Sequence, residues 1–178
     1  MKIVVGLGNP GNEYEYTRHN AGWLFLSFLE SKYGFKINEK RKNLDSIVSQ
    51  IYIDGKKVLF VKPQTFMNLS GIAVQKVKKW YDVEDKDILV VFDDIDIPFG
   101  EFRYKLSGSG GTHNGMKSIV STLNSKQMPR LRIGIGNLKH EKQDMADFVL
   151  QRFSKNELEV LENVFSEAFE KFTEFLDN

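Results

Sequence analysis

Four short apolar runs constrain the fold of this chain more than any other feature of its sequence. They read KIVVGLG at residues 2–8, KVLFVKP at 57–63, ILVVFDD at 88–94 and RLRIGIG at 130–136. Runs of this length that end in glycine, proline or acidic residues are typical of β-strands, and the last run alternates with a period of two. Because helical patterns lie between and after these runs, we expect an α/β fold around a mostly parallel or mixed sheet.

Four helices are expected from apolar residues at helical spacing. Apolar stripes over residues 21–29, 116–123 and 158–176 predict three of them, and a further helix carries Ile72, Val77 and Trp80. The residues expected at the helix ends are Gly34 after the first helix, Ser70 as the cap of the second, and Ser154 with Glu157 as a capping box before the last.

The length and composition indicate an ordinary soluble domain. The 178 residues contain no cysteine, which excludes disulfides and thiolate metal sites. We expect one domain spanning residues 1–178. No apolar run approaches the roughly 20 residues of a membrane-spanning helix, and the first run follows Met1 without a leader. A cytoplasmic protein without membrane association is therefore expected.

The net charge of +1 conceals a strong asymmetry along the chain. Residues 98–142 contain eight Lys or Arg and two acidic residues, whereas residues 143–178 contain three Lys or Arg and nine acidic residues. A solvated basic stretch before an acidic amphipathic helix explains this pattern. A basic face that binds a polyanion explains it equally well.

The turn GLGNPG after the first apolar run matches the G-x-G-x-x-G spacing of dinucleotide-binding loops. In those loops a helix begins at the third glycine, so that its N-terminus faces the pyrophosphate. Here the helical pattern begins at Ala21, well after Gly11, and Pro10 removes an N–H group that a phosphate cradle would use. The acidic ribose partner would fall at Glu30, inside a helix. We therefore interpret the turn as a strand-end loop of another kind.

Side chains suited to chemistry follow the ends of the predicted strands, where open α/β sheets bind ligands. A histidine with an aspartate and no plausible Ser or Cys nucleophile predicts a general base that activates water, with the carboxylate holding the second ring nitrogen. Asparagine amides are suited to bind a carbonyl oxygen. Taken singly, each of these residues is also explained as a turn former or a cap. The set consists of Asn9, Tyr14, His19, Phe66, Met67, Asn68, Asp93, His113 and Asn114.

The sequence DDID crowds three carboxylates, those of Asp93, Asp94 and Asp96, which could coordinate a cation such as Mg²⁺. Because no H-E-x-x-H motif and no second acidic cluster completes such a site, a solvated acidic turn is the preferred interpretation of Asp94 and Asp96. The sequence also lacks a G-x-S-x-G elbow and a Walker A motif. We expect neither a metal nor another cofactor.

Five blocks of the sequence closely resemble, in order and spacing, those of bacterial-type peptidyl-tRNA hydrolases. They read VGLGNPGNEYEYTRHNAGW, KPQTFMNLSG, DDIDIPFG, GGTHNGMKSI and RLRIGIG, and FVLQRFSKNE farther along is also similar. The resemblance implies a monomeric, metal-independent esterase with a single α/β domain, whose twisted mixed sheet is flanked by helices. It also implies cleavage of the ester between a peptide and the 3′-terminal ribose of tRNA, which recycles tRNA from peptidyl-tRNAs released prematurely from ribosomes.

The resemblance also implies roles for individual residues. His19 corresponds to the catalytic base, Asp93 to the carboxylate that supports it, and Asn9 to the asparagine that helps distinguish N-blocked from free aminoacyl-tRNA. Lys105 and Arg132 correspond to residues that reach the acceptor stem and its 5′-phosphate, contacts that position tRNA without reading its sequence. Residues implied to line the peptide and 3′-end cleft are Tyr14, Phe66, Met67, Asn68 and Asn114, with His113 either catalytic or structural. Basic residues near Lys105 and Arg132 are Lys117, Lys126 and Arg130.

Three positions depart from the family pattern. Thr112 stands where glycine is expected, Phe92 stands where many members have His or Tyr, and GNLKH follows RIGI where proline is common. None of these removes a chemical group from the expected site. From the residues alone, two other functions stay open: an RNA-binding module without catalysis and, more distantly, a nucleotide-dependent oxidoreductase.

Overall fold

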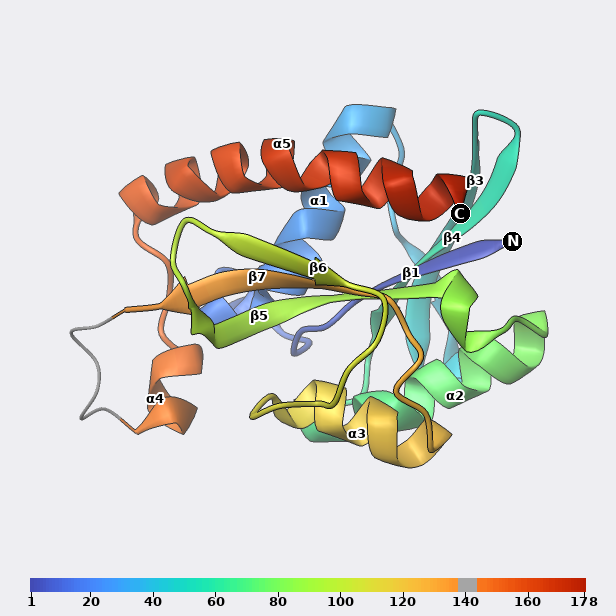
Figure 1. Cartoon of the computed structure of the whole chain (residues 1–178), viewed down its shortest axis with the longest axis horizontal. Helices are drawn as coiled ribbons and strands as arrows, with labels where there is room; N and C mark the ends of the chain where they lie inside the picture. The colour runs from blue at the N-terminus through green and yellow to red at the C-terminus, as the bar shows by residue number, and fades with distance from the viewer. Residues whose placement is uncertain (138–143) are drawn as a thin grey trace.

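A seven-stranded sheet forms the centre of the computed structural model, which describes residues 1–137 and 144–178 (Figure 1). The strand order is β2-β3-β4-β1-β5-β7-β6. The central strands β4, β1, β5 and β7 are parallel, whereas β2, β3 and β6 are antiparallel to their neighbours. The expected mixed, mostly parallel sheet is thus confirmed. The bounds are β1 Lys2–Gly6, β2 Glu39–Arg41, β3 Ser46–Ile53, β4 Lys56–Pro63, β5 Ile88–Pro98, β6 Phe102–Lys105 and β7 Arg130–Gly136.

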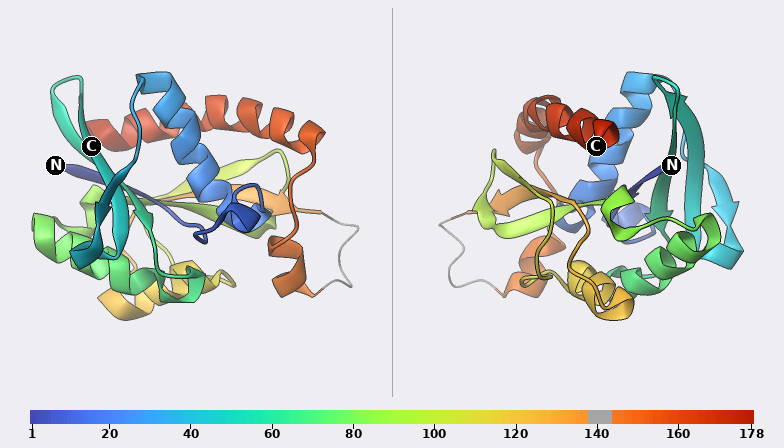
Figure 2. Two further views of the ribbon diagram at one scale, coloured as in Figure 1. Left: turned by 180° about the vertical axis from the view of Figure 1, so that it is seen from behind. Right: turned by 45° about the vertical axis from the view of Figure 1, so that its right-hand side comes forward.

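Helices cover both faces of the sheet. Figures 1 and 2 show α1 (Ala21–Tyr33) and α5 (Lys155–Asp177) on one face, and α2 (Ser70–Tyr81) and α3 (Asn114–Leu123) on the other. The short helix α4 (Met145–Val149) precedes α5. Each face has its own apolar core, because buried phenylalanines of α1 and α5 pack on one side and aliphatic residues of α2 and α3 on the other. Five 3₁₀ turns complete the described structure: η1 Asn12–Tyr14, η2 Arg18–Asn20, η3 Lys42–Leu44, η4 Met67–Leu69 and η5 Asp85–Asp87.

All four apolar runs form strands, β1, β4, β5 and β7, and all four predicted helices are present. Gly34 ends α1 in the left-handed conformation with φ of 69°, and both hydrogen bonds of the capping box at Ser154 and Glu157 are formed. The outer strands β2, β3 and β6 and the helix α4 were not predicted from the sequence. Among the described residues, no helix is both long and apolar enough to cross a membrane.

Two details of the predicted second helix are wrong. Ser70 is the first helical residue and not the cap, because its hydroxyl donates to the carbonyl oxygen of Met67 at 2.7 Å. Ile72 and Trp80 are exposed, since the face of α2 that meets the sheet is formed by Ala73, Val74 and Val77.

Strand β7 also differs from its period-two pattern. Arg130 and Leu131 at its start are both buried, as are its residues 133–135. On the face away from Leu131, Arg130 is covered by the loops whose carbonyls it bonds, and Gly134 lies against the backbone of Pro98 and Glu101. Of the GNLKH segment that follows, residues 138–140 lie outside the described residues.

The N-terminal turn of α1 lies almost directly on the sheet because residue 22 is a glycine. A Cβ atom at Gly22 would be 2.3 Å from the carbonyl oxygen of Val91 and 2.6 Å from the amide nitrogen of Leu7. The missing side chain thus lets the chain just before α1, which is η2, approach the carboxyl end of β5. This approach brings His19 of η2 close to Asp93 of β5.

Replacement of Gly22 by alanine should therefore lower the free energy of unfolding by about 1–3 kcal/mol, the usual cost of overpacking. Helix propensity alone predicts the opposite sign, a gain of up to about 1 kcal/mol for glycine to alanine within a helix. Urea unfolding followed by circular dichroism measures the difference. Ser27→Ala, at an exposed position of the same helix, is the matched control and should stay within about 0.5 kcal/mol of the parent. A Gly22→Ala protein more stable than the parent would contradict the close approach.

Candidate active site

The candidate residues converge where the parallel strands end. Asn9 lies in the turn after β1, His19 in η2, Met67 in η4 after β4, and Asp93 within β5. His113 directly precedes α3 and is its N-cap. Parallel strands present their carboxyl ends at one edge of the sheet, so segments that are distant in sequence meet there.

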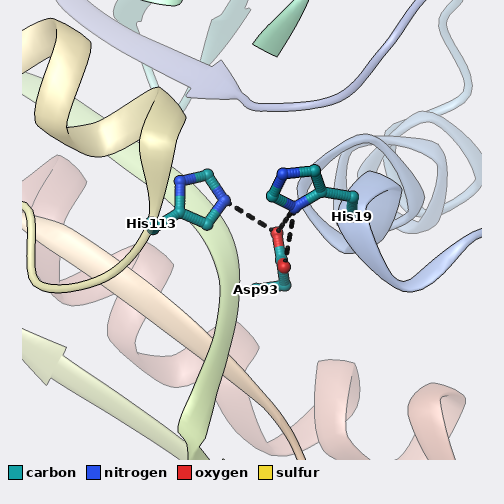
Figure 3. Close-up of side chains that lie close together, drawn as sticks. All are labelled: His19, Asp93 and His113. Carbon is teal, nitrogen blue, oxygen red and sulfur yellow. Dashed lines mark hydrogen bonds and ion pairs between the residues drawn. The ribbon is translucent and has the colours of Figure 1, made fainter. Parts of the chain in front are cut away.

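The centre of the site is the buried carboxylate of Asp93, which is 2% exposed. Nδ1 of His19 lies 3.0 and 2.9 Å from its two oxygens, and Nε2 of His113 lies 2.9 Å from Oδ1 (Figure 3). Because a buried carboxylate can only accept hydrogen bonds, both of these ring nitrogens carry protons. Asp93 thus holds two imidazoles at once.

The tautomer of His113 is fixed from its other side. Its Nδ1 accepts a hydrogen bond from the backbone N–H of Met116 at 3.1 Å, which caps α3. Nδ1 is therefore unprotonated and Nε2 is the donor to Asp93, so the ring is neutral. The ring centroids of Phe92 and His113 lie 4.9 Å apart. Phe92, which departs from the family pattern, thus gives His113 an apolar contact in place of a polar neighbour.

His19 is arranged differently, because only its Nδ1 is engaged. Its Nε2 makes no hydrogen bond to any described residue, which leaves a lone pair free in the neutral ring. Burial lowers the pKa of His19, but the charge of Asp93 and the hydrogen bond to it outweigh burial, and the pKa is raised. Burial likewise raises the pKa of Asp93, yet His19 and His113 hold it far below its usual range. The pair therefore consists of a carboxylate and a basic imidazole.

The same three side chains are the group of histidines and carboxylates in the described residues that could hold a metal ion, with ligand atoms within 4.8 Å of one another. Two imidazoles and a carboxylate are a donor set that zinc accepts. The hydrogen bonds oppose such binding. Because Nδ1 of His113 accepts the Met116 N–H, the ring proton is on Nε2, and Nε2 would have to lose this proton to bind a metal. Asp94 and Asp96 do not join the group, since Asp94 forms an ion pair with Arg132 and Asp96 is exposed.

A second set of hydrogen bonds surrounds Asn9, which is 6% exposed. Oδ1 of Asn9 accepts the backbone N–H of Met67 at 2.9 Å. The backbone N–H and C=O of Asn9 are both bonded to the side chain of Asn20, at 2.9 and 3.1 Å. Asn20 is completely buried and directly follows His19. Asn20 was not identified from the sequence, because its partner is the backbone of Asn9, 11 residues earlier, and no sequence pattern marks such a pair.

Polar and aromatic side chains border this centre without being held in it. Tyr14 packs edge-on against Phe66, with ring centroids 6.4 Å apart, and Phe66 is 54% exposed. Asn68 in η4 and Asn114 at the start of α3 are exposed, and neither amide bonds within the described residues. All four are therefore accessible to a ligand.

A cavity of about 460 Å³ opens at this centre, and His19, Asp93, His113 and Asn114 are among the residues that line it. Lys105, Lys117 and Arg132 line it, together with Asp94 and the loop of residues 108–112 that contains Thr112. Nη1 of Arg132 lies 3.0 Å from a carboxylate oxygen of Asp94, whereas Lys105 is exposed and has no ion pair among the described residues. Basic side chains of the middle segment thus reach the site.

Arg130 is a buried structural residue and is not free to contact phosphate. It is 1% exposed, and its guanidinium donates to the carbonyl oxygens of Ser109, Lys126 and Met128. Burial lowers its pKa, with a further contribution from nearby Arg132. Arg130 therefore braces the glycine-rich loop, and Lys126 is exposed outside the cavity lining.

Known proteins are similar to this chain in sequence and in fold along almost its whole length. The family model described as Peptidyl-tRNA hydrolase matches residues 3–178. The chain is 47% identical to the peptidyl-tRNA hydrolase of Carboxydothermus hydrogenoformans, over 97% of this chain and 90% of that protein. It is 42% identical to that of Caldanaerobacter subterraneus, over 100% and 94%.

The structural comparison agrees with the sequence comparisons. The crystal structure of peptidyl-tRNA hydrolase from Acinetobacter baumannii superimposes with a TM-score of 0.91 at 34% identity, covering 99% of this chain and 89% of that one. Family model, sequences and fold all point the same way. The chain therefore belongs to the peptidyl-tRNA hydrolase family, whose members are hydrolases that act on peptidyl-tRNA.

Proposed function

We propose that His19 is the general base with which this chain hydrolyses the ester between a peptide and the 3′-terminal ribose of tRNA. The observation that carries the proposal is the unequal use of the two ring nitrogens of His19. Nδ1 donates to the buried carboxylate of Asp93, and Nε2 keeps its lone pair. This is the arrangement in which a neutral imidazole takes a proton from water while a carboxylate stabilises the imidazolium that forms.

In the proposed reaction, Nε2 of His19 takes a proton from a water molecule as the water oxygen attacks the ester carbonyl carbon. The tetrahedral intermediate then expels the ribose 3′-oxygen, which receives a proton from the imidazolium. Asn9 supports these steps, because its Oδ1 is bonded to Met67 and its Nδ2 is the amide group left to donate to the substrate. No metal ion enters any step.

The proposed contacts with peptidyl-tRNA fall into two groups. Tyr14, Phe66, Met67, Asn68 and Asn114 receive the peptide and the 3′ end, with His113 fixing Asp93. Lys105 and Arg132 contact phosphates of the acceptor stem, including the 5′-phosphate, since both line the cavity beside the site. A single copy supplies every group named here, which supports a monomer. The proposed substrates are peptidyl-tRNAs released prematurely from ribosomes, and the proposed location is therefore the cytoplasm.

Removal of the imidazole tests the base directly. His19→Ala should lower kcat for hydrolysis of N-acetylaminoacyl-tRNA by about 10²- to 10⁴-fold, the usual contribution of general base catalysis. The parent enzyme in excess EDTA should keep its full rate, because no step uses a metal. Both rates are measured as release of acid-soluble radiolabelled amino acid. Full activity of His19→Ala, or loss of parent activity in EDTA that Zn²⁺ or Mg²⁺ restores, would refute the mechanism.

The raised pKa of His19 gives a specific pH dependence. Since the neutral imidazole is the active form, kcat/KM should fall as the pH is lowered through a pKa above the usual value of 6.5. Asp93→Asn removes the charge that raises this pKa, so the acid limb should move to lower pH. The plateau should also drop, because the amide no longer holds the productive tautomer of His19. An acid limb at the same pH in both proteins would separate Asp93 from the base.

Lys105 should contribute through charge alone. Lys105→Ala is expected to raise KM with little change in kcat, and to reduce the slope of log KM against log salt concentration by about 0.7–0.9, the value of one phosphate contact. The matched control is Lys57→Ala, which removes an exposed lysine at the start of β4, the end of the strand opposite to the site. Equal salt slopes for parent and Lys105→Ala would place Lys105 outside the tRNA interface.

A further inference from the structure

We infer that Asn20 is a positioning residue that sets the place of the Asn9 amide relative to His19. The inference rests on the proposed function, in which Asn9 donates to the substrate. Asn20 is completely buried, so it cannot itself touch peptidyl-tRNA. It acts through Asn9.

The hydrogen bonds of Asn20 are specific to this task. Its Oδ1 accepts the N–H of Asn9 at 2.9 Å, and its Nδ2 donates to the C=O of the same residue at 3.1 Å. A side-chain amide thus pairs with both polar groups of one backbone residue, as a neighbouring strand would. Because both backbone groups of Asn9 are bonded, its peptide units cannot rotate freely, and the turn after β1 is held against η2.

The side chain of Asn9 is then oriented by a third segment. Met67 at the start of η4 donates its N–H to Oδ1 of Asn9 at 2.9 Å. An amide whose oxygen accepts this bond must turn its Nδ2 the other way. With the backbone of Asn9 held by Asn20 and its Oδ1 held by Met67, the direction of Nδ2 is determined.

Asn20 and His19 are consecutive residues of η2, and this adjacency gives the arrangement its use. The rigid turn that carries the base also carries the clamp on Asn9. Any movement of η2 moves His19 and Asn9 together, so the spacing between base and amide donor stays constant. A change of about 1 Å in such a spacing can cost about 10²-fold in rate.

A double-mutant cycle tests this coupling. Asn9→Ala and Asn20→Ala should each lower kcat, Asn20→Ala by about 10- to 10²-fold. The double variant should have the kcat of Asn9→Ala within about twofold, because Asn20 has no other route to the reaction. The acid limb of the kcat/KM profile should be the same in Asn20→Ala and the parent, since the pair of His19 and Asp93 stays intact.

Three results would overturn the inference. Effects that multiply in the double variant would show that Asn20 acts independently of Asn9. A shifted acid limb would show that it acts through His19. An unchanged kcat in Asn9→Ala would show that the Asn9 amide does not act on the substrate. The role of His19 as base is tested separately by His19→Ala, so the failure of this inference and the failure of the proposed function can be distinguished.

A loss of stability alone must be distinguished from a loss of position. Ser46→Ala is the control, because Ser46 is 3% exposed and its hydroxyl bonds the carbonyl of Leu44 at 2.9 Å and no group of the site. It removes a buried hydrogen bond and should leave kcat unchanged. If Asn20→Ala does not fold, Asn20→Asp replaces it in the same cycle, since a carboxylate still accepts the N–H of Asn9 but cannot donate to its C=O. The same criterion of non-multiplying effects then applies.

Discussion

The shared carboxylate of Asp93 is the interaction on which the rest of the site depends. A buried charge without partners costs several kcal/mol, so this residue is tolerated at 2% exposure because two imidazole N–H groups meet it. That requirement selects one protonated nitrogen on each ring. For His113 it leaves Nδ1 free to cap α3, and for His19 it leaves Nε2 free for water. One electrostatic need thus fixes two tautomers, one helix start and the proposed base.

The backbone around Asp93 is built so that these partners cannot drift. Gly22 lets α1 rest on Val91, which sets the height of η2 above β5. Arg18 of the same turn donates to both carboxylate oxygens of Glu157 at 3.1 and 3.0 Å. Glu157 is also the capping-box residue of α5, so the longest helix of the protein is tied to the turn that carries His19. Stability of the fold and geometry of the site are therefore supplied by the same contacts.

Much of this could be predicted from the sequence, and the failures have physical causes. The central strands and the helix stripes were predicted because burial on a sheet imposes local periodicity. The outer strands β2, β3 and β6 were missed, because β3 mixes exposed and buried positions, β6 has no buried position, and β2 is three residues long. Ser70 was wrongly predicted as a cap, because its hydroxyl donates to the carbonyl oxygen of Met67. This bond forms because η4 leads directly into α2, which the local sequence does not indicate.

The candidate site follows the same division. Polar residues at strand ends were identified from strand topology and from a family resemblance. In the structure, His19, Asp93 and His113 form one hydrogen-bonded cluster, and Asn9 belongs to a second one. Their mutual orientation was not predictable, since it depends on pairs separated by 74 and 20 residues. Asn20 escaped for a related reason. Its partner is a backbone, which leaves no complementary residue type in the sequence.

The basic residues of the segment 98–142 are not equally free to bind a polyanion. Arg130 and Arg132 are two residues apart on β7. The guanidinium of Arg130 donates to internal carbonyl oxygens, whereas that of Arg132 forms an ion pair with Asp94. A phosphate that binds Arg132 must therefore compete with a carboxylate already in place. A carboxylate carries one negative charge, as does a phosphodiester, whereas a terminal phosphate carries about −1.5 to −2. Under the proposed function, with Asp94 as the competitor, Arg132 would gain more from a terminal phosphate than from an internal one, and the unpaired Lys105 would be the cation able to contact either.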